Sequence, residues 1–463
     1  MEKKLCPDMN YCGIPLPDDV AAMKAAGFFD DCRAAISNYL ESDLPDCLRK
    51  RLELELTRLD FLPLSEYPYT DSEALALLRE TFRDFHDEEL PQLVNSRAAD
   101  WLYIKGVRHF HRRFIENILT TRSDYVARQL HPTAEDEADA ARRGRIKENI
   151  AVMKAKGERA ARITVKQTFS LKPEAVENSP LTVHLPIPKP CGHQSDIRIL
   201  ELSHPEIAIV APESAPMRTV CFPHAKAGDT FSATYSYVNR LAYVEPDPAE
   251  VTDAPLPEDA LECLGEQAPN ILFTPFMRML SEEIQQGETN PLKIARNAYD
   301  FVTTKVKYSY MREYAALDTI CDYAAKNLKG DCGVQAILFI TLCRLAGVPA
   351  RWQSGFAADP SHVGCHDWAQ FYVNPYGWLY ADPSYGGSAY RGGDVERWNY
   401  YFGNLDIFRT VFNDHLHWEF DPPKAHFRAD PTDNQRGEAE YPHRGVLPFE
   451  YRHSEEMLAF EEL

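Results

Sequence analysis

The strongest local signal in the sequence is the run Lys-Gly-Asp-Cys-Gly-Val-Gln-Ala-Ile-Leu-Phe at residues 329–339. A glycine-bearing turn leads there into an almost wholly apolar helix, and Cys332 stands where the helix begins. A helix N-terminus carries partial positive charge and unpaired backbone N–H groups, which favour thiolate over thiol and can hold an oxyanion. Gly347 and Pro349 mark the end of the helix. A lone cysteine in such a place is usually a small buried hydrophobe, so the interpretation as a nucleophile depends on the residues downstream.

Two short strands follow this helix and carry a histidine and an aspartate. His366 lies in the strand-like run Gly-Cys-His-Asp-Trp at residues 364–368, which places His366 and Trp368 on one face. After a turn at residues 374–377, a second strand ends at Asp382. The two strands predict a hairpin with His366 and Asp382 on adjacent edges. A base within reach of a thiol, with a carboxylate that fixes the imidazole, is what nucleophilic catalysis needs.

These motifs resemble the transglutaminase-like superfamily of papain-type cysteine enzymes. The matching pieces are Gly-x-Cys-Gly at 330–333, Leu-Ala-Gly-Val-Pro-Ala-Arg at 345–351, His-x-Trp at 366–368, and Gly-Trp leading to Asp-Pro at 377–383. The resemblance covers roughly residues 270–390. It implies Cys332 as nucleophile, His366 as general base and acid, and Asp382 as orienter. It also implies an α+β fold, in which the helix bearing the cysteine packs on an antiparallel sheet bearing the histidine and aspartate.

The resemblance also directs attention to residues around the candidate triad. The family places an aromatic or polar side chain near the oxyanion, and Tyr308 and Tyr310 are both candidates, between which the sequence does not choose. Gly333 and Trp368 are further oxyanion or substrate-contact candidates. The family often has a small residue before its histidine, whereas this chain has Cys365. Because side chains alternate along a strand, we expect Cys365 to point away from the histidine face and to be structural.

A metal site is an alternative to the catalytic interpretation of these residues. His362, Cys365 and His366 lie close together in sequence, and Cys332 could join them as a further ligand. Their spacing is not a known zinc pattern, and no Asp-x-Asp-x-Asp-Gly calcium loop is present. We therefore expect no metal and no other cofactor.

Composition limits the partners and the setting of the chain. A formal net charge of -20 over 463 residues would repel nucleic acid and anionic lipid surfaces, so neither is an expected partner. The N-terminus lacks the apolar run of a signal peptide, and no stretch has the roughly 20 apolar residues that span a bilayer. Eleven cysteines without repeated spacing favour a reducing, cytoplasmic setting. The sequence leaves the oligomeric state open.

Hydrophobic periodicity divides the chain into four expected regions. Residues 1–157 form a mainly helical region, in which Ala98–Leu130 suits one amphipathic helix. Residues 158–247 alternate and turn as a β-sandwich-like domain does. Residues 248–405 form the transglutaminase-like catalytic domain. Residues 406–463 contain repeated Asp-Pro pairs and few periodic apolar positions, and form an irregular C-terminal extension.

The expected function is a cysteine-dependent hydrolase of amide or peptide bonds that acts through a thioester acyl-enzyme. The substrate would then be a peptide or another amide-containing molecule. Two alternatives stay open. The first is acyl transfer from a protein glutamine to an amine, as in transglutaminases. The second is a non-catalytic binding scaffold with a vestigial triad, in which the helical N-terminal region binds a partner.

Overall fold

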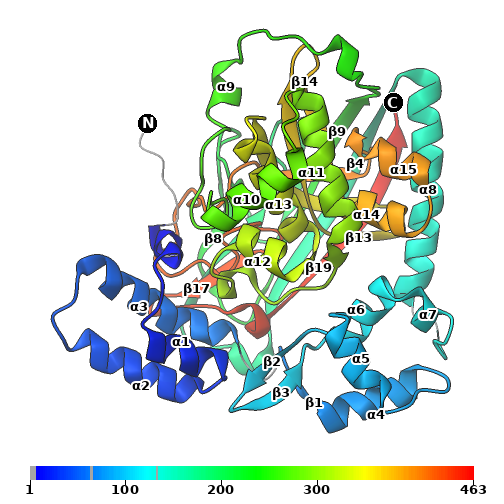
Figure 1. Ribbon diagram of the computed structural model, residues 1–463. Coiled ribbons are helices and arrows are strands. Elements are labelled where there is room, and N and C mark those ends of the chain that lie inside the picture. Colours follow the sequence, from blue (N-terminus) through cyan, green and yellow to red (C-terminus); the bar gives the residue numbers. More distant parts are fainter. Residues whose placement is uncertain (1–6, 63–65, 132–133) are drawn as a thin grey trace.

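A computed structural model describes residues 7–62, 66–131 and 134–463 as a mixed α/β protein with antiparallel sheets (Figure 1). The N-terminal region contains helices and one small sheet. Its helices are α1 (Asp18–Ala25), α2 (Phe29–Leu40), α3 (Asp46–Arg58), α4 (Asp71–Thr81), α5 (Glu89–Asn95), α6 (Phe114–Thr121), α7 (Ser123–Val126) and α8 (Ala134–Lys156). Its strands β1 (Tyr69–Thr70), β2 (Trp101–Ile104) and β3 (Val107–Phe110) form a sheet in the order β1-β3-β2.

The helix expected over Ala98–Leu130 is wrong. Strands β2 and β3 occupy its first half as an antiparallel hairpin, and only α6 and α7 are helical in the rest. Lys105 and Gly106 join the strands with φ angles of 51° and 75°. Two successive residues with positive φ form the tight turn that matches strand twist, and glycine adopts that conformation readily. The Lys-Gly pair was the sequence signal for a hairpin.

The middle of the chain forms two antiparallel sheets around one hydrophobic core. Its strands are β4 (Glu158–Leu171), β5 (Pro180–Pro186), β6 (Gln194–Leu202), β7 (Ile209–Val210), β8 (Thr219–Lys226) and β9 (Thr230–Ala242). Together with β17 (Glu438–Tyr441), β18 (Arg444–Gly445) and β19 (Tyr451–Glu462), they form sheets in the orders β19-β4-β9-β6 and β18-β17-β5-β8-β7. Inward-facing side chains from both sheets, including Val165, Leu185 and Phe231, are fully buried in this core. Alternation of apolar and polar residues along the strands accounts for the arrangement.

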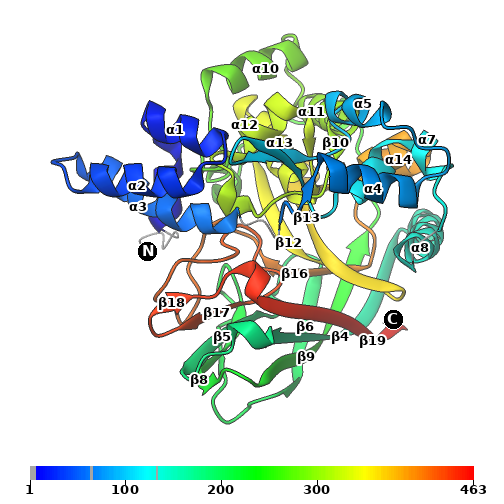
Figure 2. The ribbon, with the colours of Figure 1, turned by 90° about the horizontal axis from the view of Figure 1, so that it is seen from below.

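The expectation of an irregular C-terminal extension is also wrong, because its strands complete the sheets. They are β16 (Arg409–Asn413), β17 (Glu438–Tyr441), β18 (Arg444–Gly445) and β19 (Tyr451–Glu462). Strand β19 pairs with β4 over nearly its whole length (Figure 2). Its side chains are mostly polar and exposed, so hydrophobic periodicity was too weak to reveal an edge strand whose stability comes from backbone pairing with β4.

The region between these parts holds the candidate site. Its helices are α9 (Glu258–Leu261), α10 (Pro275–Gln285), α11 (Pro291–Lys305), α12 (Ile320–Asn327), α13 (Cys332–Leu345), α14 (Pro383–Arg391) and α15 (Val395–Tyr400). Its strands are β10 (Lys307–Tyr308), β11 (Lys329–Gly330), β12 (Ala350–Asp359), β13 (His362–Val373), β14 (Gly377–Ala381) and β15 (Phe402–Gly403). Five strands form an antiparallel sheet in the order β15-β14-β13-β12-β16.

This sheet lies between the helices and the two-sheet core (Figure 2). On one face, Phe371 of β13 packs against Phe339 of α13, with 5.9 Å between their ring centroids. On the other, Phe356 and Phe412 belong to the same core as strands β4 to β9. The helix that begins at Cys332, and the hairpin of β13 and β14, are both as predicted. The helix and the sheet are therefore locked together by buried apolar contacts.

Candidate active site

Helix α13 fixes the position of Cys332 through its cap. The Asp331 carboxylate accepts a hydrogen bond of 3.3 Å from the Val334 N–H and another from the Tyr314 hydroxyl. Burial raises the pKa of Asp331 to about 6, against these hydrogen bonds. At Gly333 an added Cβ would lie 2.4 Å from the Tyr314 hydroxyl oxygen and 2.8 Å from an Asp367 carboxyl oxygen. Glycine is therefore required in the first turn, because its neighbours leave no space for a side chain.

The thiol of Cys332 is paired with a carboxyl group that the sequence did not single out. Its Sγ donates a hydrogen bond of 3.4 Å to Oδ2 of Asp367. Among the hydrogen bonds of residues 7–62, 66–131 and 134–463, none joins this thiol to the ring of His366. Burial, together with the nearby Asp367 and Asp331, raises the pKa of Cys332 well above its usual range. In this arrangement Cys332 is a protonated thiol.

His366 and Asp382 form the other half of the site. Nε2 of His366 lies 2.7 Å from Oδ2 of Asp382, and both side chains are buried. Burial would raise the pKa of Asp382, but His366 and Arg409 lower it, so Asp382 is a carboxylate. Burial lowers the pKa of His366 despite the attraction of Asp382, so the ring is neutral at pH 7. With Nε2 engaged, Nδ1 is the nitrogen that can take a proton.

Arg409 braces this pair from strand β16. Its Nη2 lies 2.9 Å from Oδ2 of Asp382 and 2.6 Å from Oδ2 of Asp406, and all three side chains are nearly inaccessible to solvent. The guanidinium carbon lies 4.6 Å from the ring centroid of Tyr385. Tyr385 in turn packs on His366, with 4.4 Å between ring centroids. One buried cation therefore fixes both the carboxylate and the aromatic neighbour of the histidine.

Asp367 is held by the C-terminal segment, residues 414–437, which joins β16 to β17. Nε2 of Gln435 donates a hydrogen bond of 2.7 Å to Oδ1 of Asp367 and one of 3.0 Å to the backbone carbonyl of His366. The hydroxyl of Ser354 donates 2.5 Å to the backbone carbonyl of Asp433, which ties the same segment to β12. Burial, and then the charge of Asp331, raises the pKa of Asp367 well above its usual range. The segment thus forms part of the site.

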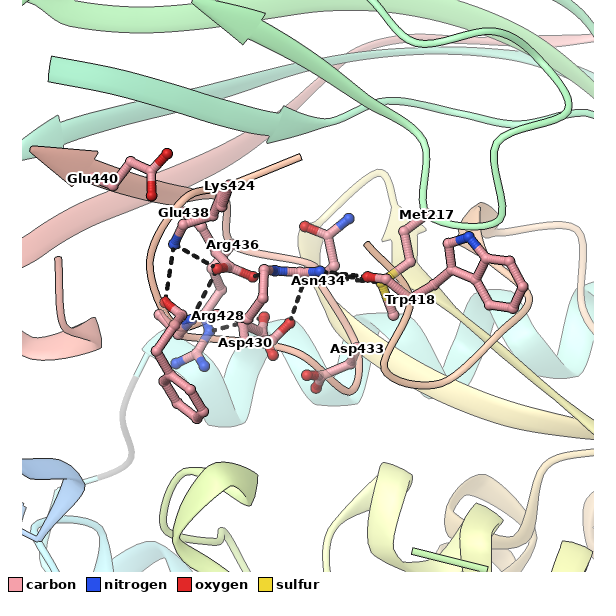
Figure 3. A network of polar contacts seen from close by, with 12 residues as sticks. Met217, Trp418, Lys424, Arg428, Asp430, Asp433, Asn434, Arg436, Glu438 and Glu440 are labelled. Carbon is pink, nitrogen blue, oxygen red and sulfur yellow. Dashed lines mark hydrogen bonds and ion pairs between the residues drawn. The ribbon is translucent and has the colours of Figure 1, made fainter. Parts of the chain in front are cut away.

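A buried charge network gives this segment its shape (Figure 3). The carboxylate of Glu438 accepts hydrogen bonds of 2.7 Å from Nε of Arg428 and 2.9 Å from Nζ of Lys424. Arg428 also donates 2.6 Å to the Trp418 carbonyl, and its guanidinium lies 3.5 Å from the Phe420 ring centroid. Burial would raise the pKa of Glu438, but Arg428 and Lys424 lower it to about 2. These contacts tie Lys424 and Arg428 to Glu438, and Gln435 lies between them in the chain.

Cys332, His366 and Asp367 line one cavity of about 1560 Å³. Its walls come from distant parts of the chain, including Arg113 of the N-terminal region and Arg436 of the C-terminal segment. Asp382 lies behind His366 and is fully buried. The N-terminal region therefore provides one wall of the candidate site, a role the sequence left undecided.

The other candidate residues occupy different places. Tyr308 and Tyr310 line the cavity and contact each other edge to face, with 5.4 Å between ring centroids. Tyr310 is tied to the N-terminal region, because Asn117 accepts 2.6 Å from its backbone N–H and Arg113 stacks on its ring. Trp368 is fully buried and donates 2.8 Å to Gln353, so it packs beneath the site and does not line the cavity.

Sequence reasoning missed Asp367, Arg409 and Gln435. Asp367 offered a signal, since a carboxyl group between His366 and Trp368 on an otherwise apolar strand has to find a buried partner. Arg409 and Gln435 offered none, because their contacts with the site join segments far apart in sequence. No group of three or more His, Cys, Asp or Glu side chains suited to a metal is found in the part of the chain that the structure describes.

Comparison with known proteins places the site in a family. Residues 278–383 match the family model of the transglutaminase-like superfamily, so the resemblance seen in the motifs is confirmed. The matched range contains Cys332, His366 and Asp382. The search of curated proteins gave no match.

Solved structures of two bacterial proteins are similar to this chain. A proposed cysteine protease from Cytophaga hutchinsonii matches with a TM-score of 0.39 and 15% identity, over 66% of this chain and 90% of that one. The periplasmic domain of TgpA from Pseudomonas aeruginosa matches with a TM-score of 0.29 and 15% identity, over 54% of this chain and 94% of that one. None of the described helices is long and apolar enough to cross a membrane.

Proposed function

We propose that this protein is a cysteine-dependent hydrolase of amide or peptide bonds, with Cys332 as nucleophile, His366 as general base and acid, and Asp382 as orienter. The observation that carries the proposal is the buried His366–Asp382 pair, 2.7 Å apart, whose histidine lines one cavity with a cysteine at a helix N-terminus. The match of residues 278–383 to the transglutaminase-like superfamily supports it.

The first step moves the thiol proton from Sγ of Cys332 to Nδ1 of His366. Because Sγ is bonded to Asp367 in the resting state, substrate binding must turn the thiol toward the imidazole. The thiolate then attacks the carbonyl carbon, and the carbonyl π electrons move to oxygen. The backbone N–H groups of Cys332 and Gly333, which have no partner within the helix, are placed to hold that oxyanion.

Collapse of this intermediate expels the amine, which takes the proton from His366, and leaves a thioester on Cys332. Water then attacks the thioester while His366 removes its proton, and the acid departs as the thiol is restored. Asp382 keeps Nε2 of His366 protonated, so that Nδ1 does the proton transfer in both halves. Trp368 serves as a positioning residue beneath His366, with 6.0 Å between their ring centroids.

Hydrolysis and acyl transfer differ only in what attacks the thioester. The cavity is lined by many charged side chains, and such a surface admits water to the acyl-enzyme, which supports hydrolysis. A direct test adds hydroxylamine to a reaction on an acyl donor and measures the ratio of free acid to hydroxamate. Predominant free acid at millimolar hydroxylamine agrees with the proposal, whereas near-complete capture by the amine favours a transferase.

Reactivity of the thiol tests the catalytic assignment itself. Intact mass is followed after the protein is mixed with an activated ester of an N-acylated amino acid, which acylates the nucleophile of an enzyme that works through an acyl-enzyme. Wild type should gain one acyl group, which is absent in Cys332→Ala and forms more slowly in His366→Ala. Cys343→Ala, a buried cysteine on the same helix, is the matched control and should leave the acylation unchanged. If wild type gains no acyl group at Cys332, the scaffold hypothesis replaces the enzyme.

We also propose that the protein works in a reducing, cytoplasmic compartment, on a peptide or amide-containing substrate. The ten cysteines within the described ranges are all free thiols, which supports that setting. Non-reducing peptide mapping of protein purified under thiol-blocking conditions tests this, and a native disulfide would contradict it.

A further inference from the structure

The cavity around Cys332 differs in charge from the molecule as a whole. The chain carries a formal charge of -20, yet the cavity is lined by eight arginines against eight aspartates and glutamates. Burial raises the pKa of Asp367 and of Asp433 well above the usual range. These two carboxyl groups hold their protons and leave the arginines in excess, so the cavity attracts anions.

Several of the cavity arginines are already paired with a carboxylate. Arg436 makes two hydrogen bonds of 2.9 and 2.5 Å to Glu313. Arg112 lies 3.1 Å from Glu66. Arg391 differs, as does Arg143 of α8, because within the ranges that the structure describes neither has a hydrogen bond or ion pair. The side chain of Arg391 is exposed to solvent, as a group that receives a ligand must be.

Arg391 lies on the helix that follows Asp382, the candidate orienter. Helix α14 begins immediately after Asp382, and Arg391 is its last residue. Its Nη1 lies over Gly387, where an added Cβ would come within 3.2 Å. Tyr308 is an electrostatic neighbour of both Arg391 and Cys332. The cavity therefore presents a thiol, a phenol and an arginine that makes no hydrogen bond or ion pair within the described ranges.

We propose that Arg391 binds a carboxylate of the substrate, so that the enzyme prefers peptides carrying a free carboxylate near the scissile amide. A guanidinium donates two parallel hydrogen bonds to a carboxylate, which fixes orientation as well as position. This inference rests on the proposed function, since it names the substrate class of the same site. A substrate carboxylate accounts for the surplus positive charge of the cavity, which catalysis by Cys332 and His366 does not require.

Two alkylating reagents of similar size test it. Iodoacetate carries the carboxylate and iodoacetamide does not, so the ratio of their rates at Cys332 reports the preference for an anion and cancels the intrinsic reactivity of the thiol. Arg391→Gln should lower this ratio about fivefold, the scale expected when one unit charge is removed from a cleft of intermediate dielectric. Arg391→Lys should largely retain it. Arg240→Gln, which removes an exposed arginine from β9, is the matched control and should not alter it.

An unchanged ratio in Arg391→Gln overturns the inference while leaving the proposed function intact. If neither reagent modifies Cys332, the proposed function fails, and peptide binding decides the inference independently. Calorimetry then compares N-acetyl-dialanine with its C-terminal amide on the Cys332→Ala protein. Tighter binding of the free acid, lost when Arg391→Gln is added, supports the carboxylate site. Equal binding of the acid and the amide overturns it.

Discussion

The two halves of the candidate site are built differently. His366 is fixed on every side, by Asp382 at 2.7 Å, by the ring of Tyr385 and, through Asp382, by the buried Arg409. Cys332 is placed by the cap of its helix, and its thiol donates a hydrogen bond to Asp367. On the proposed assignment, the base is therefore preorganised, while the nucleophile stays protonated until a substrate rearranges it.

The largest loss of activity is expected from a change in the His366–Asp382 pair. Asp382→Asn removes the charge that holds Nε2 of His366 in its protonated form, so the ring is free to adopt the wrong tautomer. We expect kcat/KM on an amide substrate to fall by about 10²- to 10⁴-fold, the usual contribution of an oriented base. Steady-state kinetics measure this, with circular dichroism as the control for folding. A loss of less than threefold would remove Asp382 from the mechanism.

Replacement of Arg409, which binds Asp382 from behind, should lower the free energy of unfolding. Arg409→Met leaves the Asp382 and Asp406 carboxylates buried without a cation, which destabilises by about 3–5 kcal/mol. Urea unfolding measures the change. The matched control is Arg240→Met, whose exposed partner Glu158 makes the expected loss at most about 1 kcal/mol. Equal losses in the two variants would show that Arg409 is not the brace described here.

The stability of the segment that holds Asp367 should depend on pH. The pKa of Glu438 is about 2 in the folded protein and about 4.3 in an unfolded chain. A lowered folded pKa stabilises the fold above the unfolded pKa, and that stabilisation is lost as pH falls from about 5 to 2. Glu438→Gln should therefore cost about 3 kcal/mol at pH 7 and flatten the acid side of the stability profile. Thermal unfolding at a series of pH values decides, and parallel profiles for the two proteins would contradict it.

The smallest effect is expected from a change at Asp367, the hydrogen-bond partner of Cys332. Asp367→Asn keeps a hydrogen-bonding group near Sγ but removes a carboxyl group whose ionisation raises the pKa of Cys332. The thiolate should form at lower pH, and alkylation by iodoacetamide at pH 7 should accelerate about tenfold. The pH profile of alkylation is the measurement. If the profile does not move toward lower pH, Asp367 does not set the ionisation of the thiol.

Local patterns in the sequence predicted the central elements well. The glycine-bearing turn, the apolar run behind it and the Gly347 and Pro349 stop predicted helix α13, because each acts on residues within one or two turns. The β13–β14 hairpin was equally readable from its turn and its alternation. The hairpin of β2 and β3 was missed because its apolar residues also suit a helix, and β19 was missed because an edge strand has little hydrophobic pattern of its own.

The helix that begins at Cys332 and the hairpin that carries His366 and Asp382 follow from local sequence, since periodicity and turns are properties of neighbouring residues. The surroundings of these three residues depend on tertiary packing. The contact between Cys332 and Asp367 spans 35 positions, and the one between Gln435 and Asp367 spans 68. Such contacts arise when the buried cores bring distant strands together, and a buried polar group then takes whichever partner lies within hydrogen-bonding distance.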